Sequence, residues 1–214
     1  SFEELENPDS KLATQVIAAD GEILTTFHIE NRSYVSYDEL SPNLVNAAVA
    51  TEDSRFYRHS GIDFESLARV LVKTVLGGSS SQGGGSTITQ QLAKTLYPRE
   101  DMGGSKFKMV WTKLKEWVTA VKLERSYTKD EIMNMYMNQV FFGSNAYGIK
   151  AASQTFFGKN PIDLTVEESA TLVGMVNKPT RYNPALNPDK SIVRRNFVIS
   201  QMEKAGFISK EMCD

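Results

Sequence analysis

The chain has 214 residues, of which 41% are hydrophobic and 23% charged, a composition typical of a globular domain with one substantial core. The net charge of −2 argues against a nucleic-acid binder held by bulk charge. Cys213 is the only cysteine, so an internal disulfide and a thiolate metal cage are excluded, and two separated histidines disfavour a histidine-rich zinc site. No run approaches the roughly 20 apolar residues of a membrane span.

The N-terminal part favours β-structure. Two β-rich runs, residues 14–19 and 23–29, flank Asp20-Gly21, and Asp-Gly between such runs is a strong hairpin signal. Residues 34–37 are expected to extend this sheet. We therefore predict an N-terminal β arm over residues 1–40 and a mostly α domain over residues 41–214.

The helices are indicated by their end signals. Ser41-Pro42 fits an N-cap followed by proline at the first helical position, and Asp63 is expected to cap the next helix. Thr128 and Thr165 each begin a capping box, with glutamate three residues later. The expected helices cover residues 43–51, 64–75, 86–96, 108–125, 129–140, 151–157, 166–176 and 191–205.

A charged and aromatic cluster, residues 50–63, lies at the junction between the first two helices. It contains two adjacent carboxylates, Glu52 and Asp53, two arginines, two aromatic residues and His59. A lone histidine beside a helix junction is more often a structural hydrogen-bonding residue than a catalyst, so we favour that interpretation for His59. Glu52 is the candidate catalytic base.

A glycine-rich loop leads directly into the third predicted helix. Gly84-Gly85-Ser86-Thr87 precedes a helix N-terminus, where free N–H groups favour an anion, but no lysine follows the glycine as in a Walker loop. Thr87, Gln90 or Gln91, and Lys94 have the spacing of one helix face. This face is either a solvated surface after a linker or a phosphate or sugar site; the glutamines and lysine favour the site.

Three other places leave their interpretation open. Lys113 and Glu116 on the long helix favour an ordinary i,i+3 surface pair when the helix is taken alone, although the small Ala120 would leave room for a ligand above Glu116. Tyr136 and Asn138 fit either core and cap positions or a site. Residues 194–195, an Arg-Arg pair, are either exposed or an anion clamp.

Five blocks in order resemble the peptidoglycan glycosyltransferase domain of class A penicillin-binding proteins and monofunctional transglycosylases (glycosyltransferase family 51). They resemble the family patterns EDxxFxxHxG, GGSTITQQLAK, KxKE…LE, EILExYLNxxxxG, and LTxxExA followed by PxxYNP. The blocks are residues 52–61, 84–94, 113–124, 131–143 and 164–184. One segment departs from the pattern: residues 98–112 are longer and use lysines, so Arg99 or Lys108 is only a candidate for the family's approach arginine.

The resemblance implies a lysozyme-like helical fold that polymerises lipid II into β-1,4 glycan strands, with inversion and release of undecaprenyl pyrophosphate. It implies that Glu52 is the base and that Glu116 orients the donor or a divalent cation such as Mg²⁺ or Mn²⁺, as a possible ligand. The residues it assigns to substrate binding are Asp53, Phe56, His59, Gly85, Ser86, Thr87, Gln90, Gln91, Lys94, Lys113, Tyr136 and Asn138.

The implied partners are lipid II, the growing glycan, moenomycin-type inhibitors and the outer face of the bacterial cell membrane, but no nucleic acid. Because the chain begins at Ser1 without methionine, we expect a piece of a longer protein, with the anchor elsewhere. Phe107, Met109, Val110 and Trp111 lie among lysines and fit either an interfacial patch or an ordinary helix start. The rival functions are a lysozyme-like glycan hydrolase and a non-catalytic module that binds glycan or lipid pyrophosphate.

Overall fold

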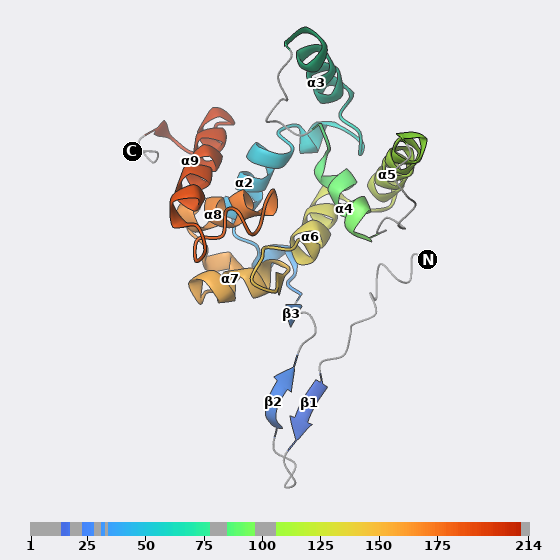
Figure 1. The fold of residues 1–214 in the computed structure, drawn as a ribbon. Helices are drawn as coiled ribbons and strands as arrows, with labels where there is room; N and C mark the ends of the chain where they lie inside the picture. The colour runs from blue at the N-terminus through green and yellow to red at the C-terminus, as the bar shows by residue number, and fades with distance from the viewer. Residues whose placement is uncertain are drawn as a thin grey trace.

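The computed structural model describes residues 14–17, 23–27, 31–32, 34–77, 85–96 and 106–210, which are mostly helical (Figure 1). The helices are α2 (Pro42–Glu52), α3 (Phe64–Gly77), α4 (Ile88–Leu96), α5 (Lys106–Ser126), α6 (Lys129–Gln139), α7 (Ile149–Phe157), α8 (Val166–Val176) and α9 (Pro188–Lys204). Short 3-10 turns are η1 (Tyr37–Glu39), η2 (Phe56–Arg58) and η3 (Pro161–Asp163). The predicted mostly α fold is confirmed. No helix in these described ranges is long and apolar enough to cross a bilayer.

The N-terminal strands confirm the hairpin but not its extension. β1 (Thr14–Ile17) pairs antiparallel with β2 (Ile23–Phe27), and the Asp20-Gly21 turn lies outside the described residues. The expectation for residues 34–37 is wrong: this segment enters η1, and the side chain of Asn138 binds both the N–H and the C=O of Val35, at 3.0 and 2.9 Å. The chain here is therefore held against α6.

A second small sheet was not expected from the sequence. β3 (Asn31–Arg32) pairs in parallel with β4 (Ala146–Tyr147), which lies between the predicted helices 129–140 and 151–157. Parallel pairing between segments more than 100 residues apart leaves no local sequence signal, because both strands are only two residues long.

The predicted helix caps are present. Ser41 Oγ accepts from Asn43 N–H, Asp63 Oδ1 accepts from Ser66 N–H, and the capping boxes at Thr128 and Thr165 are both formed. Five helix starts differ from prediction by one to three residues: those of α2, α4, α5, α7 and α9. α4 begins at Ile88 because the Thr87 side chain caps it, accepting from Gln90 N–H at 3.1 Å, and α9 begins three residues early, with proline at its first position.

The position of α2 decides where the charged cluster lies. α2 packs against both α8 and α9 in the centre of the helical body (Figure 1), and its Leu44, Ala47 and Ala48 are almost completely buried. Alanine at the contacts lets neighbouring helices approach closely. α4 packs against α5 and α6 on the other side. Glu52 is the last residue of α2 and therefore lies at the edge of the core, between the α8–α9 pair and the group formed by α4, α5 and α6.

Candidate active site

Glu52 is the carboxylate at the end of α2, and it is partly buried. Burial raises its pKa above the ordinary glutamate value, and the negative charge of Asp53 acts in the same direction. A hydrogen bond from Gln91 and the positive charge of Arg194 oppose this rise. A carboxylate with a raised pKa binds a proton more tightly than a solvent-exposed glutamate does. It can act as a base as long as part of it is ionised.

Gln91 on α4 connects Glu52 to Tyr136 on α6. The Tyr136 hydroxyl donates to Gln91 Oε1 at 3.1 Å, and Gln91 Nε2 donates to Glu52 Oε2 at 3.0 Å. Tyr136 is buried, and burial together with the charges of Glu52 and Asp53 raises its pKa well above the usual value. The phenol therefore stays a donor, and it fixes the amide so that the N–H group faces the carboxylate.

Glu116 on α5 is the second carboxylate of the site. It is only 7% exposed, and Lys113 Nζ contacts its Oε2 at 2.9 Å and Ser86 Oγ at 3.0 Å. The i,i+3 pair expected from the sequence is present, but the burial of Glu116 distinguishes it from a surface pair. Lys113 thus joins α5 to the segment that leads into α4.

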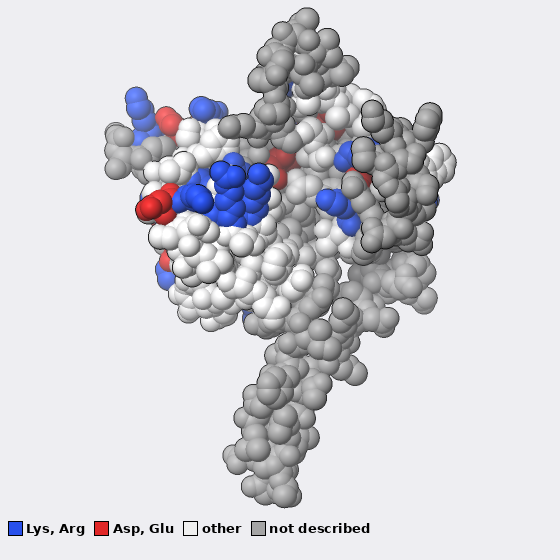
Figure 2. Space-filling model, in the orientation of Figure 1, with Lys and Arg blue, Asp and Glu red and all other residues white. Residues whose placement is uncertain are grey.

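Both carboxylates border α4: Glu52 at Gln91, and Glu116 through Lys113 and Ser86. Lys94 is exposed three residues after Gln91, on the same side of the helix. Figure 2 shows one basic group over α4 and a larger one over α9 and the loop before it, with acidic atoms between them. The structure therefore brings these groups together around α4.

Two backbone donors at the N-terminus of α4 already have partners within the protein. Ile88 N–H donates to Asp53 Oδ2 at 3.0 Å, and Gln90 N–H donates to Thr87 Oγ1. Thr87 Oγ1 also donates to the carbonyl of Gly61. Asp53 and Thr87, both buried, already accept from these two donors, and phosphate binding at this helix end stays a prediction.

Several residues expected to bind substrate have internal partners instead. His59 Nε2 contacts both carboxylate oxygens of Asp53, at 3.0 and 2.9 Å, and Nδ1 accepts from Gly61 N–H, which supports the structural interpretation of this histidine. Phe56 is completely buried, and Gln90 Nε2 donates to the Gly61 carbonyl. Asp53, Thr87 and Asn138 also have partners within the protein, so this structure shows these residues holding the site together, and substrate binding by them stays a prediction.

The space expected above Glu116 is taken by protein. Ala120 is fully buried, and Gly61 lies so close to it that an added Cβ would be 2.8 Å from the Ala120 carbonyl carbon. The small side chain at position 120 therefore admits the 59–63 loop rather than a ligand.

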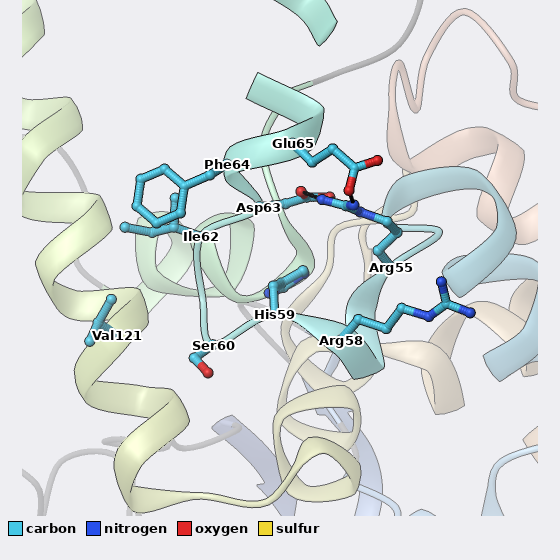
Figure 3. A pocket seen from close by; sticks show the side chains of 9 residues that line it. All are labelled: Arg55, Arg58, His59, Ser60, Ile62, Asp63, Phe64, Glu65 and Val121. Atoms are coloured by element: carbon cyan, nitrogen blue, oxygen red, sulfur yellow. Dashed lines mark hydrogen bonds and ion pairs between the residues drawn. The ribbon is translucent and has the colours of Figure 1, made fainter. Parts of the chain in front are cut away.

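A separate pocket of about 460 Å³ lies on the α3 side of the cluster (Figure 3). Arg55 pairs with Asp63 and Glu65 at its edge. Burial raises the pKa of Asp63, but bonds from Arg55 and Ser66 outweigh it and hold that pKa well below its usual range. Its lining is Arg55, Arg58, His59, Ser60, Ile62, Asp63, Phe64, Glu65 and Val121. Glu52 and Glu116 are absent from this lining, so the fold divides the charged cluster between two faces.

No group of three acidic, histidine or cysteine side chains that could hold a metal comes together within the described ranges. Lys113 moreover contacts Glu116 Oε2. A magnesium ion needs only one or two carboxylates when substrate phosphates supply further oxygens, so the donor set fits a cation only together with substrate. Glu116 as a metal ligand stays a prediction.

Sequence reasoning did not assign Arg194 a role, although it noted the arginine pair. In the structure Arg194 acts electrostatically on Glu52, and its guanidinium lies over the rings of Tyr182 and Phe197. The sequence could not assign this role, because the position of Arg194 depends on the packing of α9 against α2 and α8.

Comparison with known proteins agrees with this geometry. The family model described as transglycosylase matches residues 20–203. The chain belongs to the transglycosylase family. It is 39% identical to penicillin-binding protein 1A of Aquifex aeolicus over 95% of this chain, and 43% identical to penicillin-binding protein 1A/1B of Bacillus subtilis over 94%. It covers 28% and 22% of those two relatives, so it spans about a quarter of their length.

The fold of this transglycosylase domain is also that of a solved relative. The crystal structure of penicillin-binding protein 1A from Haemophilus influenzae aligns with 94% of this chain and 19% of that one, with a TM-score of 0.52 and 23% identity. The predicted resemblance to the glycosyltransferase domain of class A penicillin-binding proteins is confirmed, as is the helical fold that it implied.

Proposed function

We propose that this domain polymerises lipid II by inverting glycosyl transfer, with Glu52 as the general base. The observation that carries the proposal is the Tyr136–Gln91–Glu52 chain, which directs an N–H group at a carboxylate of raised pKa. A sugar hydroxyl is a poor nucleophile near neutral pH, so a carboxylate must take its proton as the bond forms. Glu52 is the described carboxylate best prepared for this step.

The reaction transfers one glycan to another. The acceptor 4-hydroxyl oxygen attacks the anomeric carbon of the donor, its proton passes to Glu52, and the bond from that carbon to the pyrophosphate oxygen breaks. The electron pair leaves with undecaprenyl pyrophosphate, and attack from the opposite face gives a β-1,4 linkage. No strong acid is required, in contrast to a glycosidase, because pyrophosphate leaves well once its charge is neutralised.

Lys113 and Lys94 are the residues proposed to neutralise that charge. Lys113 is held between Ser86 and Glu116, and Lys94 is exposed on the side of α4 that carries Gln91. Fixed cations beside a leaving group stabilise charge that develops in the transition state. A divalent cation bound by Glu116 and the pyrophosphate would supply further charge neutralisation.

The proposed location is the outer face of the bacterial cell membrane, where the lipid tail of the substrate stays in the bilayer. Trp111, Leu114 and Val118 are 57%, 44% and 57% exposed and lie along one face of α5, at i, i+3 and i+7. The side chains of residues 106–110, which include the other members of the expected patch, lie outside the described residues. An exposed apolar face on a lysine-containing helix supports contact with a lipid surface. Binding of moenomycin-type inhibitors belongs to the same proposal.

Incubation with lipid II and Mg²⁺ in detergent tests the function against its rivals. Polymeric glycan is the expected product. Solubilisation of purified sacculi without polymer would indicate a hydrolase, and binding of lipid II without turnover would indicate a non-catalytic module.

A further inference from the structure

The two adjacent arginines of α9 have different environments. Arg195 is bound to the side chain of its neighbour Asn196, through Nε at 3.0 Å and a terminal nitrogen at 2.9 Å. Arg194 lies across α8 instead: its Nε donates to the Gly174 carbonyl at 3.4 Å, and a Cβ on Gly174 would lie 3.0 Å from Arg194 Cγ. The missing side chain at position 174 therefore makes room for the stem of Arg194.

Two aromatic rings hold the guanidinium of Arg194. Its central carbon is 5.6 Å from the ring centre of Tyr182 and 4.8 Å from that of Phe197. Arg181 lies over the same Tyr182 ring at 5.8 Å. Stacking restricts a guanidinium to one orientation while leaving its in-plane donors free, so less entropy is lost when it binds an anion.

These cations have no acidic partner among the described residues. Arg55, Lys113, Lys129 and Lys159 each lie within 4 Å of a carboxylate, whereas no such ion pair is formed by Arg181 or Arg194. The positive charge of Arg194 acts on Glu52, where it opposes the rise of the pKa that burial causes. Figure 2 shows a basic surface over α9 and the loop before it, the elements that carry Arg194 and Arg181.

We propose that Arg194, with Arg181 and the ring of Tyr182, forms an anion-binding subsite that holds a carboxylate or phosphate of the acceptor sugar chain while its hydroxyl faces Glu52. The inference rests on the proposed function. Arg194 reaches this position from α9, and α9 packs on α2, which ends at Glu52. A planar, stacked guanidinium is suited to two-pronged recognition of such groups.

Two parts of the acceptor carry this chemistry: the carboxylates of its peptide stem and its pyrophosphate. Three lipids separate them: natural lipid II, lipid II with amidated stem carboxylates, and the disaccharide lipid without a stem. The rates are compared at a pH above the acid limb of both enzymes, where Glu52 is ionised with or without Arg194. If the stem is bound, Arg194→Ala then lowers kcat/KM on natural lipid II but not on the other two. If the pyrophosphate is bound, the variant loses the same factor on all three.

The experiment compares Arg194→Ala, Arg194→Lys and the matched control Arg195→Ala. We expect kcat/KM on natural lipid II to fall about 10- to 100-fold for Arg194→Ala and by a smaller factor for Arg194→Lys, which keeps the charge but not the planar donors. Arg195→Ala should stay within about twofold of the wild type. Equal activity of Arg194→Ala and Arg195→Ala on natural lipid II would overturn the inference.

Two further measurements keep the result clear. The melting curve shows whether Arg194→Ala folds. If it does not, the test uses Arg194→Lys and Arg181→Ala, a change at an exposed residue. Wild-type activity in both of these variants would refute the subsite. If the wild type makes no polymer, the proposed function falls, and the subsite is judged by NMR titration with inorganic pyrophosphate and free stem pentapeptide. A shift of the Arg194 side-chain resonances with either probe would support the subsite. If neither probe shifts them, the subsite is refuted.

Discussion

Gln91 donates its side-chain N–H to Glu52 Oε2 across 3.0 Å. This bond favours the ionised carboxylate, while burial and the charge of Asp53 favour the protonated form. The amide cannot reverse its ends without losing the hydrogen bond that its oxygen accepts from Tyr136. The pKa of Glu52, at the end of α2, therefore depends on Gln91 of α4, and Tyr136 of α6 fixes the orientation of Gln91.

Replacing Gln91 by leucine should move the acid limb of activity to higher pH. A base works when ionised, so activity is present above the pKa of Glu52 and lost below it. Removing a donor to the ionised form raises that already raised pKa further. The measurement is kcat/KM for lipid II as a function of pH. Tyr136→Phe should give a smaller shift of the same sign, and a downward shift in Gln91→Leu would contradict the assignment.

Glu52→Gln should abolish polymerisation while leaving the fold intact. The amide has nearly the same shape but cannot accept the hydroxyl proton, which removes a contribution of about 10²- to 10⁴-fold in rate. The checks are glycan length on gels and the melting temperature, which should change little because Glu52 is only partly buried. Normal polymer from this variant would rule out Glu52 as the base.

The two lysines should respond differently to replacement by alanine. Lys94 is exposed, so Lys94→Ala should weaken donor binding without changing the melting temperature. Lys113 contacts the buried Glu116, so Lys113→Ala should weaken donor binding and also cost about 1 kcal/mol of stability, because a buried carboxylate loses its cation. Donor KM and thermal melting distinguish the two. Identical behaviour of both variants would show that Lys113 has no structural role.

The helices could be predicted because their end signals are local. Ser41, Asp63, Thr128 and Thr165 cap the helices expected from the sequence, since a cap involves only neighbouring residues. The pairing of β3 with β4 could not be predicted, because it joins distant segments of two residues each.

The site was predictable in its chemistry but not in its division of roles. The family blocks selected Asp53, His59 and Gln90 together with Glu52, and nothing in spacing separates a side chain that contacts substrate from one that holds a loop. The structure separates them through hydrogen-bond partners: Asp53 caps α4, His59 holds Asp53, and Gln90 binds the Gly61 carbonyl. Glu52 and Gln91 lie 39 positions apart in sequence, so their contact depends on the packing of α2 and α4.

Gly61 is the residue where the loop of the charged cluster meets α5. Its φ of +91° is unfavourable for other residues, and a Cβ would lie 2.8 Å from the carbonyl carbon and 2.9 Å from the carbonyl oxygen of Ala120. Backbone atoms of a helix cannot move away as a flexible side chain would. Gly61→Ala should therefore cost more than the left-handed conformation alone, about 3 kcal/mol or more in the free energy of unfolding.

Gly206→Ala is the matched control for this prediction. Gly206 also has a positive φ, +77°, but an added Cβ would meet nothing within 4 Å, so only the conformational cost of about 1 kcal/mol remains. Activity should separate the two variants further. The Gly61 carbonyl accepts from Thr87 and Gln90 at the start of α4, so a shifted loop moves Gln91 relative to Glu52 and lowers kcat even at temperatures where the variant is folded. Equal melting temperatures and full activity in both variants would show that the loop and α4 are not coupled.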